Sequence, residues 1–351
     1  NERFNRVLSV YQILPGPEAH ELCVYFGYLA RGRVGGLLAG LGFMLPGFVL
    51  MLLLSWFYVN YGINSVLFAG VFYGMKAAVG ALIVRAVHRI GGHALHDRWL
   101  WGIAGIAALA HLAGVNFIVI LALAGIAYTL FKRGYAVVGL ALGAVSLVVI
   151  AVLGVNLLNT GGAALATVTT ATGAVGIPGL FGAGLRSGLL TFGGAYTVIS
   201  FLQNDAVIVG NWMTTAQFLD GIALSGILPA PLVIFGTFVG YIGGGLAGAV
   251  AITVGIFAPA FAFTLIGHNL IERLVGNPAL HDFLDGVTGG VVGLIAATTL
   301  VLLRAAITDV PTLLIFAVGL FVLFRWKHKL NVPAVVLAAG VVGLLVVNLS
   351  A

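Results

Sequence analysis

The chain has 351 residues, of which 61% are hydrophobic and only 7% are charged, and its formal net charge is +6. An ordinary soluble domain carries roughly a quarter charged residues, so this composition indicates a multi-pass membrane protein. The Lys and Arg residues are dispersed between apolar runs, which argues against nucleic acid as a partner. The one cysteine, Cys23, excludes an internal disulfide and a cysteine metal site.

Apolar stretches long enough to cross, or nearly cross, about 30 Å of hydrocarbon occur along the whole chain. They lie near residues 7–30, 35–58, 66–88, 99–114, 116–131, 135–156, 180–203, 216–242, 246–270, 283–304, 309–325 and 332–349. Residues 159–179 are rich in Gly, Ala and Thr, which is typical of a linker. We therefore expect an all-α polytopic membrane protein with three parts, 1–158, 159–179 and 180–351.

Basic residues predict the orientation, because cytoplasmic loops carry an excess of Lys and Arg. If the loop with Arg31 and Arg33 lies inside, alternation also places Arg89, Lys132 and the run from Arg325 to Lys329 inside. Arg85, His88 and Arg89 share one helix face near this inner end, and we interpret them as anchors of the positive-inside kind.

The two halves contain a repeat. "RFNRVLSVYQILPGP" (3–17) matches "QFLDGIALSGILPAP" (217–231), and "GYLARGRVGGLLAGLGFMLPGF" (27–48) matches "GYIGGGLAGAVAITVGIFAPAF" (240–261). Alternation places the two copies in opposite orientations, so we expect two inverted-topology repeats with Pro/Gly-broken helices. The segment 180–203 has no counterpart in the first half, and the chain opens on Asn1, so we expect that a first helix is missing.

Pro and Gly residues break the predicted helices at three places, residues 15–17, 192–194 and 229–231. A break frees backbone N–H and C=O groups that lipid cannot satisfy, and a helix that resumes after it aims N–H groups and a positive dipole end at the gap. This geometry favours a compact, multiply charged oxyanion. The alternative is that Pro and Gly simply kink or pack helices. The substrate-binding candidates are the residues of these breaks, Pro15, Gly16, Pro17, Phe192, Gly193, Gly194, Pro229, Ala230 and Pro231. After Gly193 and Gly194, the helix is expected to resume at Ala195.

Charged residues within apolar segments cost roughly 3 kcal/mol or more and indicate function by default. Lys76 and Arg186 are candidate counter-charges for an anion; alternatively they snorkel to an interface or pair with an acid such as Asp285. Three residues after the first break are candidates for proton coupling, namely Glu18, His20 and Glu21. As helix-end acids, the two glutamates would cap N–H groups. His20 could also be simply packed.

Metal and cofactor chemistry have little support in the sequence. His93, His96 and Asp97 form too small a set for a metal site, and we interpret them as a solvated loop. No phosphate-binding Gly-rich loop with its Lys is present in the sequence. We expect no metal and no cofactor.

Several motifs resemble the chromate ion transporter family: "FGGAYT", "QFLDGIALSGILPAP", "VYQILPGPEAHELCVYFGYL", "GGLLAGLGFMLPGF" and "GMKAAVGALIVRAV". The resemblance covers residues 3–90 and 180–304 and is to the long, two-repeat form. It implies a multi-pass protein of the bacterial inner membrane that extrudes chromate, with a proposed use of the proton gradient and sulfate as a related oxyanion. Ala195 stands where the family commonly has Pro. A homodimer is also considered.

Our leading hypothesis is a secondary active transporter, not an enzyme, that exports chromate or a related oxyanion by alternating access. The alternatives are a transporter of sulfate or another oxyanion, an intramembrane enzyme acting on a phosphorylated or lipid-linked substrate with His20 and Glu21 as acid and base, and a structural membrane module. Export is the favoured direction because moving a dianion out of a negative-inside cell gains about 4–5 kcal/mol per 100 mV.

Overall fold

The computed structural model describes residues 16–62, 65–159, 173, 175–192, 194–266 and 277–350, and every regular element in these ranges is a helix. Five stretches of this described part are long and apolar enough to span a membrane: Glu18–Gly62, Leu67–Ala94, Leu232–Leu265, Pro278–Ala306 and Asn331–Leu349. The expectation of an all-α polytopic membrane protein is confirmed.

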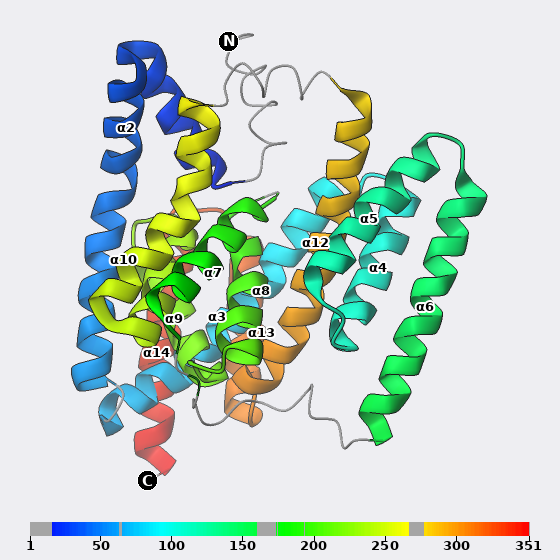
Figure 1. Cartoon of the computed structure of the whole chain (residues 1–351). Coiled ribbons are helices and arrows are strands. Elements are labelled where there is room, and N and C mark those ends of the chain that lie inside the picture. The colour runs from blue at the N-terminus through cyan, green and yellow to red at the C-terminus, as the bar shows by residue number, and fades with distance from the viewer. Residues whose placement is uncertain are drawn as a thin grey trace.

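The described helices pack side by side into one bundle (Figure 1). The first half contains α2 (Glu18–Phe57), the π-helical segment η1 (Tyr58–Gly62), α3 (Val66–Ala94), α4 (Arg98–Leu112), α5 (Phe117–Lys132) and α6 (Ala136–Asn159). The second half contains α7 (Ile177–Leu189), α8 (Thr197–Gln203), the π-helical segment η3 (Asn204–Val209), α9 (Thr215–Ile227), the short η4 (Leu232–Ile234), α10 (Phe235–Leu265), α12 (Pro278–Ala306), α13 (Val310–Arg325) and α14 (Asn331–Ser350).

Helix α2 is a hairpin of two antiparallel arms. The backbone leaves the helical region at Arg31 (φ −145°, ψ 32°) and Gly32 (φ 60°, ψ −152°). Gly27 lies against Gly35, so closely that a Cβ atom on Gly27 would collide with the Gly35 carbonyl. Residues eight apart in a straight helix are about 12 Å apart, so the chain must reverse here. The arm before the bend, which starts at Glu18, is about 20 Å long and cannot cross the hydrocarbon alone.

Helix α10 contains the same hairpin. Its bend lies at Gly244 (φ −163°, ψ 26°) and Gly245 (φ 59°, ψ −148°), and Gly240 lies against Gly248. The positive-φ glycines of the two bends, Gly32 and Gly245, are 213 residues apart, which is the offset between the matched sequences 27–48 and 240–261. In Figure 1 the bend of α2 lies at the upper end of the molecule and that of α10 in its lower half.

The long arm of each hairpin contains a proline and lies beside the break of the other half. Gly47, which follows Pro46, packs on Ala230. A Cβ atom placed on Gly47 would lie 2.9 Å from the Cβ of Ala230. Next to Pro259 in α10, the ring of Phe257 lies 4.7 Å from that of His20. Protein atoms therefore cover both breaks.

Small residues let the helices approach closely, as is usual in membrane bundles. Gly184 and Gly188 of α7 lie against backbone carbonyls of α10, and Gly293 of α12 against a carbonyl of α4. The predicted segments 66–88 and 283–304 are too short, because α3 and α12 continue past their apolar windows to Ala94 and back to Pro278. Polar residues such as His93 end a hydropathy window without ending a helix.

The bend of α2 gives a stability prediction. The conformation of Gly32 is accessible essentially only to glycine, so Gly32→Ala is expected to cost about 1–3 kcal/mol. Gly42, in the long arm of the same hairpin, is the matched control, because a methyl group there meets nothing within 4 Å. Thermal unfolding in detergent, followed by gel filtration, should show a lower midpoint for Gly32→Ala alone. Equal midpoints for the two variants would contradict the bend.

Candidate functional site

Two of the three breaks lie together. Gly16 (φ 153°) donates its N–H to the carbonyl of Thr191 at 2.9 Å, so the start of α2 meets the gap between α7 and α8. Phe192 is buried, and Gly194 has a φ of 128°. Pro15 and Gly193 lie outside the described residues. The helix after this gap begins at Thr197, not at Ala195 as expected, because the turn after Gly194 takes two further residues.

The break formed by Pro229, Ala230 and Pro231 lies between α9 and η4. The contact that places it is with the long arm of α2, through Ala230 and Gly47. Just before the break, Gly226 faces Leu82 of α3 and Val332 of α14 at 3.8–4.0 Å from its Cβ position. The structure thus brings the break at residues 15–17 into direct contact with the break at residues 192–194, and places the break at residues 229–231 against neighbouring helices.

The first turn of α2 buries two polar side chains without partners. His20 and Glu21 are both 0% exposed, and neither the ring nitrogens nor the carboxyl oxygens have a hydrogen-bond partner among the described residues. The helix starts after Pro17 with no side-chain cap, so the expectation that Glu18 or Glu21 caps the N–H groups is wrong. The Glu21 carboxyl instead lies at Gly16, where a Cβ atom would collide with Oε1.

Lys76 of α3 pairs with an acid. Its Nζ lies 3.7 Å from Oδ1 of Asp220 in α9, and the Tyr58 hydroxyl donates to Asp220 Oδ2 at 2.9 Å. The Lys76 side chain is 24% exposed and that of Asp220 only 9%. Of the alternatives for Lys76, the structure shows pairing with an acid, but the partner is Asp220 and not Asp285.

Arg186 of α7 also pairs with an acid. Its Nη2 lies 3.0 Å and its Nε 3.3 Å from Oδ2 of Asp205 in η3. The Arg186 side chain is 49% exposed, whereas that of Asp205 is 7% exposed. Both cations that the sequence identifies as counter-charges therefore have carboxylate partners in this arrangement.

Sequence reasoning missed the partners of these cations. Asp220 carried a signal, because it is the one charged residue in the predicted segment 216–242 and the rule that selected Lys76 applies to it equally. Tyr58 and Asp205 carried no such signal in the sequence. Each belongs to a π-helical segment, Tyr58 to η1 and Asp205 to η3. Such segments often occur at functional sites.

The loop between α3 and α4 holds a helix cap, not a metal site. Asp97 accepts hydrogen bonds from the backbone N–H groups of Trp99 and Leu100 at 2.9 and 3.0 Å. The Tyr128 hydroxyl donates to the other Asp97 oxygen at 2.7 Å. Within the described ranges, no group of three or more His, Cys, Asp or Glu could hold a metal ion.

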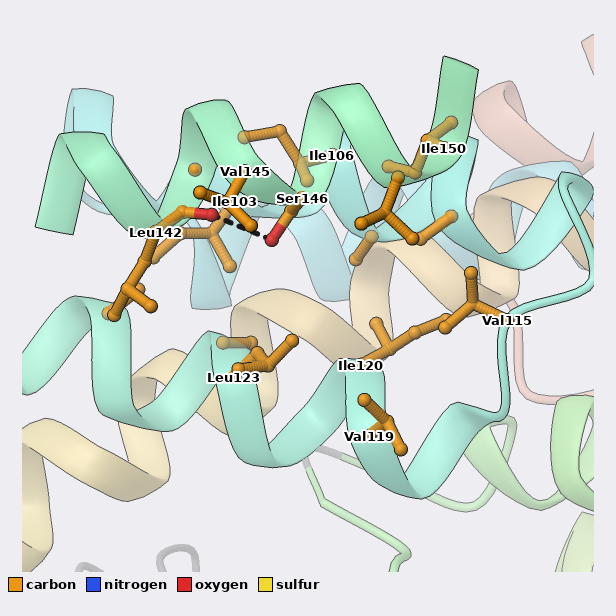
Figure 2. A pocket seen from close by; sticks show the side chains of 16 residues that line it. Ile103, Ile106, Val115, Val119, Ile120, Leu123, Leu142, Val145, Ser146 and Ile150 are labelled. Carbon is orange, nitrogen blue, oxygen red and sulfur yellow. Dashed lines mark hydrogen bonds between the residues drawn. The ribbon is translucent and has the colours of Figure 1, made fainter. Parts of the chain in front are cut away.

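A groove of about 300 Å³ between α4, α5 and α6 is a poor site for an anion (Figure 2). Its lining is almost entirely aliphatic, and the hydroxyl of Ser146 donates to the Leu142 carbonyl at 2.8 Å. Such a surface suits an acyl chain. Buried charged side chains lie elsewhere in the molecule, among them Glu21 at the first turn of α2 and Asp220 in α9.

Helices that break inside an apolar bundle and carry buried charged side chains are typical of secondary transporters. The family model described as chromate transporter matches residues 1–130 and 178–344, and the chain belongs to the chromate transporter family. This is a family of transporters and not of enzymes, as expected.

Relatives named as chromate transport proteins are similar over nearly the whole chain. One from Pseudomonas aeruginosa is 53% identical over 99% of this chain and 83% of its own length. One from Cupriavidus metallidurans is 30% identical over 96% of this chain and 81% of its own length. A probable chromate transport protein from Synechococcus elongatus is 29% identical over 96% of this chain and 84% of its own length. No solved structure matches the chain.

The Lys76–Asp220 pair predicts coupled stabilities. Lys76→Met leaves a buried carboxylate and Asp220→Asn leaves a cation, so each single change should cost about 1–3 kcal/mol. The double variant should lose clearly less than the sum, because neither charge is then left alone. Thermal midpoints of the four proteins in detergent measure the coupling, with Tyr58→Phe as a control that removes one hydrogen bond only. Strictly additive losses would show that the pair is not an energetic unit.

Proposed function

We propose that this chain is a secondary active transporter of the bacterial inner membrane that exports chromate, or a related tetrahedral oxyanion, by alternating access. Membership of the chromate transporter family and relatives named for chromate transport support the substrate class. The hydrogen bond from Gly16 to Thr191 is the observation that carries the mechanism, because it joins two broken helices inside an apolar bundle.

In the proposed site, helix N-termini hold the anion. The first N–H groups of α2, after Pro17, have no carbonyl four residues earlier in the helix to bond, and the positive end of the helix dipole adds to their attraction for an anion. The turn at Gly194 brings further backbone groups to the same place. We propose that residues 15–18, 193–196 and 229–232 together form the substrate site.

Lys76 and Arg186 are proposed to balance the charge of the substrate. In the described arrangement Asp220 and Asp205 neutralise them. A bound dianion would compete with these carboxylates for the same cations, so substrate binding would change the pairing. Such an exchange links the anion to the positions of α3, α7 and α9, which carry the partners.

Alternating access is proposed to use two inverted repeats. The hairpins of α2 and α10 share their bend geometry at equivalent sequence positions, and their bends lie toward opposite ends of the molecule (Figure 1). Each long arm also lies beside the break of the other half. A rocking of one hairpin against the other would therefore open the breaks toward one side and close them toward the other.

Proton coupling is proposed for the first turn of α2. An ionised carboxylate without a partner is costly in an apolar interior, so we propose that Glu21 holds a proton in the described state. Water or a cation that reaches it in another state would release the proton. His20 is the second candidate, and Glu18, which lies nearer the surface, is the third.

The charge-balance proposal is tested by flux. Lys76→Ala and Arg186→Ala are each expected to reduce chromate uptake into inverted vesicles more than tenfold per folded protein, because the cations then no longer offset the dianion. Arg133→Ala is the control, since this exposed residue lies between α5 and α6. Sulfate and molybdate in parallel assays test the substrate class. Full flux by both variants would remove the two cations from the mechanism.

Coupling is tested separately in proteoliposomes. Glu21→Gln, which keeps the shape of the side chain but cannot release a proton, is expected to abolish the stimulation of chromate flux by a pH gradient. Asp282→Asn on α12 is the matched control and should keep the stimulation. An unchanged response of Glu21→Gln would exclude this carboxyl as the proton carrier.

A further inference from the structure

A cavity of about 410 Å³ collects basic side chains from separate parts of the chain. Arg85 and Arg89 come from α3, and Lys327, His328 and Lys329 come from the connection between α13 and α14. We call this cavity the basic pocket, and no carboxylate lines it among the residues that the structure describes. Its remaining lining residues are Leu82, Ala86, Tyr196, Asn331 and Val332.

The four Lys and Arg residues of the basic pocket form no salt bridge within the described part of the chain. The salt bridges found there join Lys76 to Asp220, Lys132 to Asp97 and Arg186 to Asp205. Like charges that share a cavity repel one another and favour a bound anion. Anchoring at the inner membrane surface explains basic residues on one side of the membrane, but not their convergence on one cavity.

The basic pocket lies close to the breaks at Gly194 and at Pro229–Pro231. Tyr196, two residues after Gly194, lines it and interacts electrostatically with Arg85 and Arg89. Arg89 also interacts electrostatically with Glu18, in the first turn after the first break. Near the break at Pro229–Pro231, the lining residues Leu82 and Val332 lie 4.0 and 3.8 Å from the Cβ position of Gly226, which just precedes this break.

We propose that the basic pocket is the cytoplasmic vestibule of the transporter, where a tetrahedral oxyanion binds before it reaches the breaks. This proposal rests on the proposed function. A water molecule occupies about 30 Å³ of liquid, so the pocket has room for such an anion with part of its hydration shell. Lys327 and Lys329 are exposed at its mouth, and Arg85 is half-buried. The side chains are thus arranged to attract an anion from water and pass it to Tyr196.

If the basic pocket is a vestibule, removing its charges should change the KM for chromate and not kcat. A cleft lined by one sign of charge raises association rates by roughly 10 to 10³ times, and salt weakens the effect. Lys327→Gln/Lys329→Gln should therefore raise the KM for chromate uptake into inverted vesicles at least about fivefold, leave kcat within about twofold, and flatten the dependence on ionic strength. Arg98→Gln/Arg133→Gln, which removes the same charge away from the pocket, should leave all three unchanged. An unchanged KM in the lysine variant overturns the proposal.

Equilibrium binding separates the vestibule from transport. Trp326 stacks on His328 beside the pocket, with ring centroids 5.8 Å apart, and chromate absorbs where tryptophan emits. Quenching that disappears in Trp326→Phe and weakens in the lysine variant is expected in nanodiscs of phosphatidylcholine alone. If flux is absent but this quenching is seen, the proposed function fails and the binding pocket stands. If quenching requires phosphatidylglycerol, or chromate does not compete with that lipid, the pocket binds a lipid headgroup and the proposal is overturned.

Discussion

The structure depends on one constraint: a break in a helix inside a bilayer exposes backbone groups that lipid cannot satisfy. At the first break, the Thr191 carbonyl accepts a hydrogen bond from the N–H of Gly16, so one broken helix satisfies part of another. The long arms of α2 and α10 cover the breaks from outside, and the glycines of α7 allow close contact with α10. The paired arrangement of hairpins serves this need, because each long arm packs beside the break of the other half.

The two halves share this scaffold but not its chemistry. After the break at Pro17 come His20 and Glu21, both buried and without a hydrogen-bond partner in the described residues, whereas the four residues after Pro231, from Leu232 to Phe235, are all apolar. The apolar rings of Phe257 and Phe261 surround His20. Shared bends and packing thus provide the framework, and the unshared polar residues of the first half provide the proposed coupling.

Much of the fold could be predicted because local rules determine it. Hydropathy located the helices, and the Pro and Gly motifs located the breaks, since both signals lie within a few residues of the feature. The partner of Lys76 could not be predicted in this way, because Asp220 lies 144 residues further along the chain and only packing brings them together. By contrast, the bends at Arg31–Gly32 and Gly244–Gly245 lie in the connections that hydropathy placed between segments 7–30 and 35–58 and between segments 216–242 and 246–270.

The cations of the molecule differ in their pairing in a way that suits an anion pathway. The Lys and Arg residues of the basic pocket form no salt bridge in the described part of the chain, whereas Lys76 and Arg186 are both paired with carboxylates. A cation in water needs no partner, but a buried one does. In the proposed mechanism, an anion is therefore attracted without cost at the surface, but further in it must replace a carboxylate. Because that replacement changes contacts between helices, the paired cations Lys76 and Arg186, and not the unpaired cations of the basic pocket, are suited to couple binding to movement.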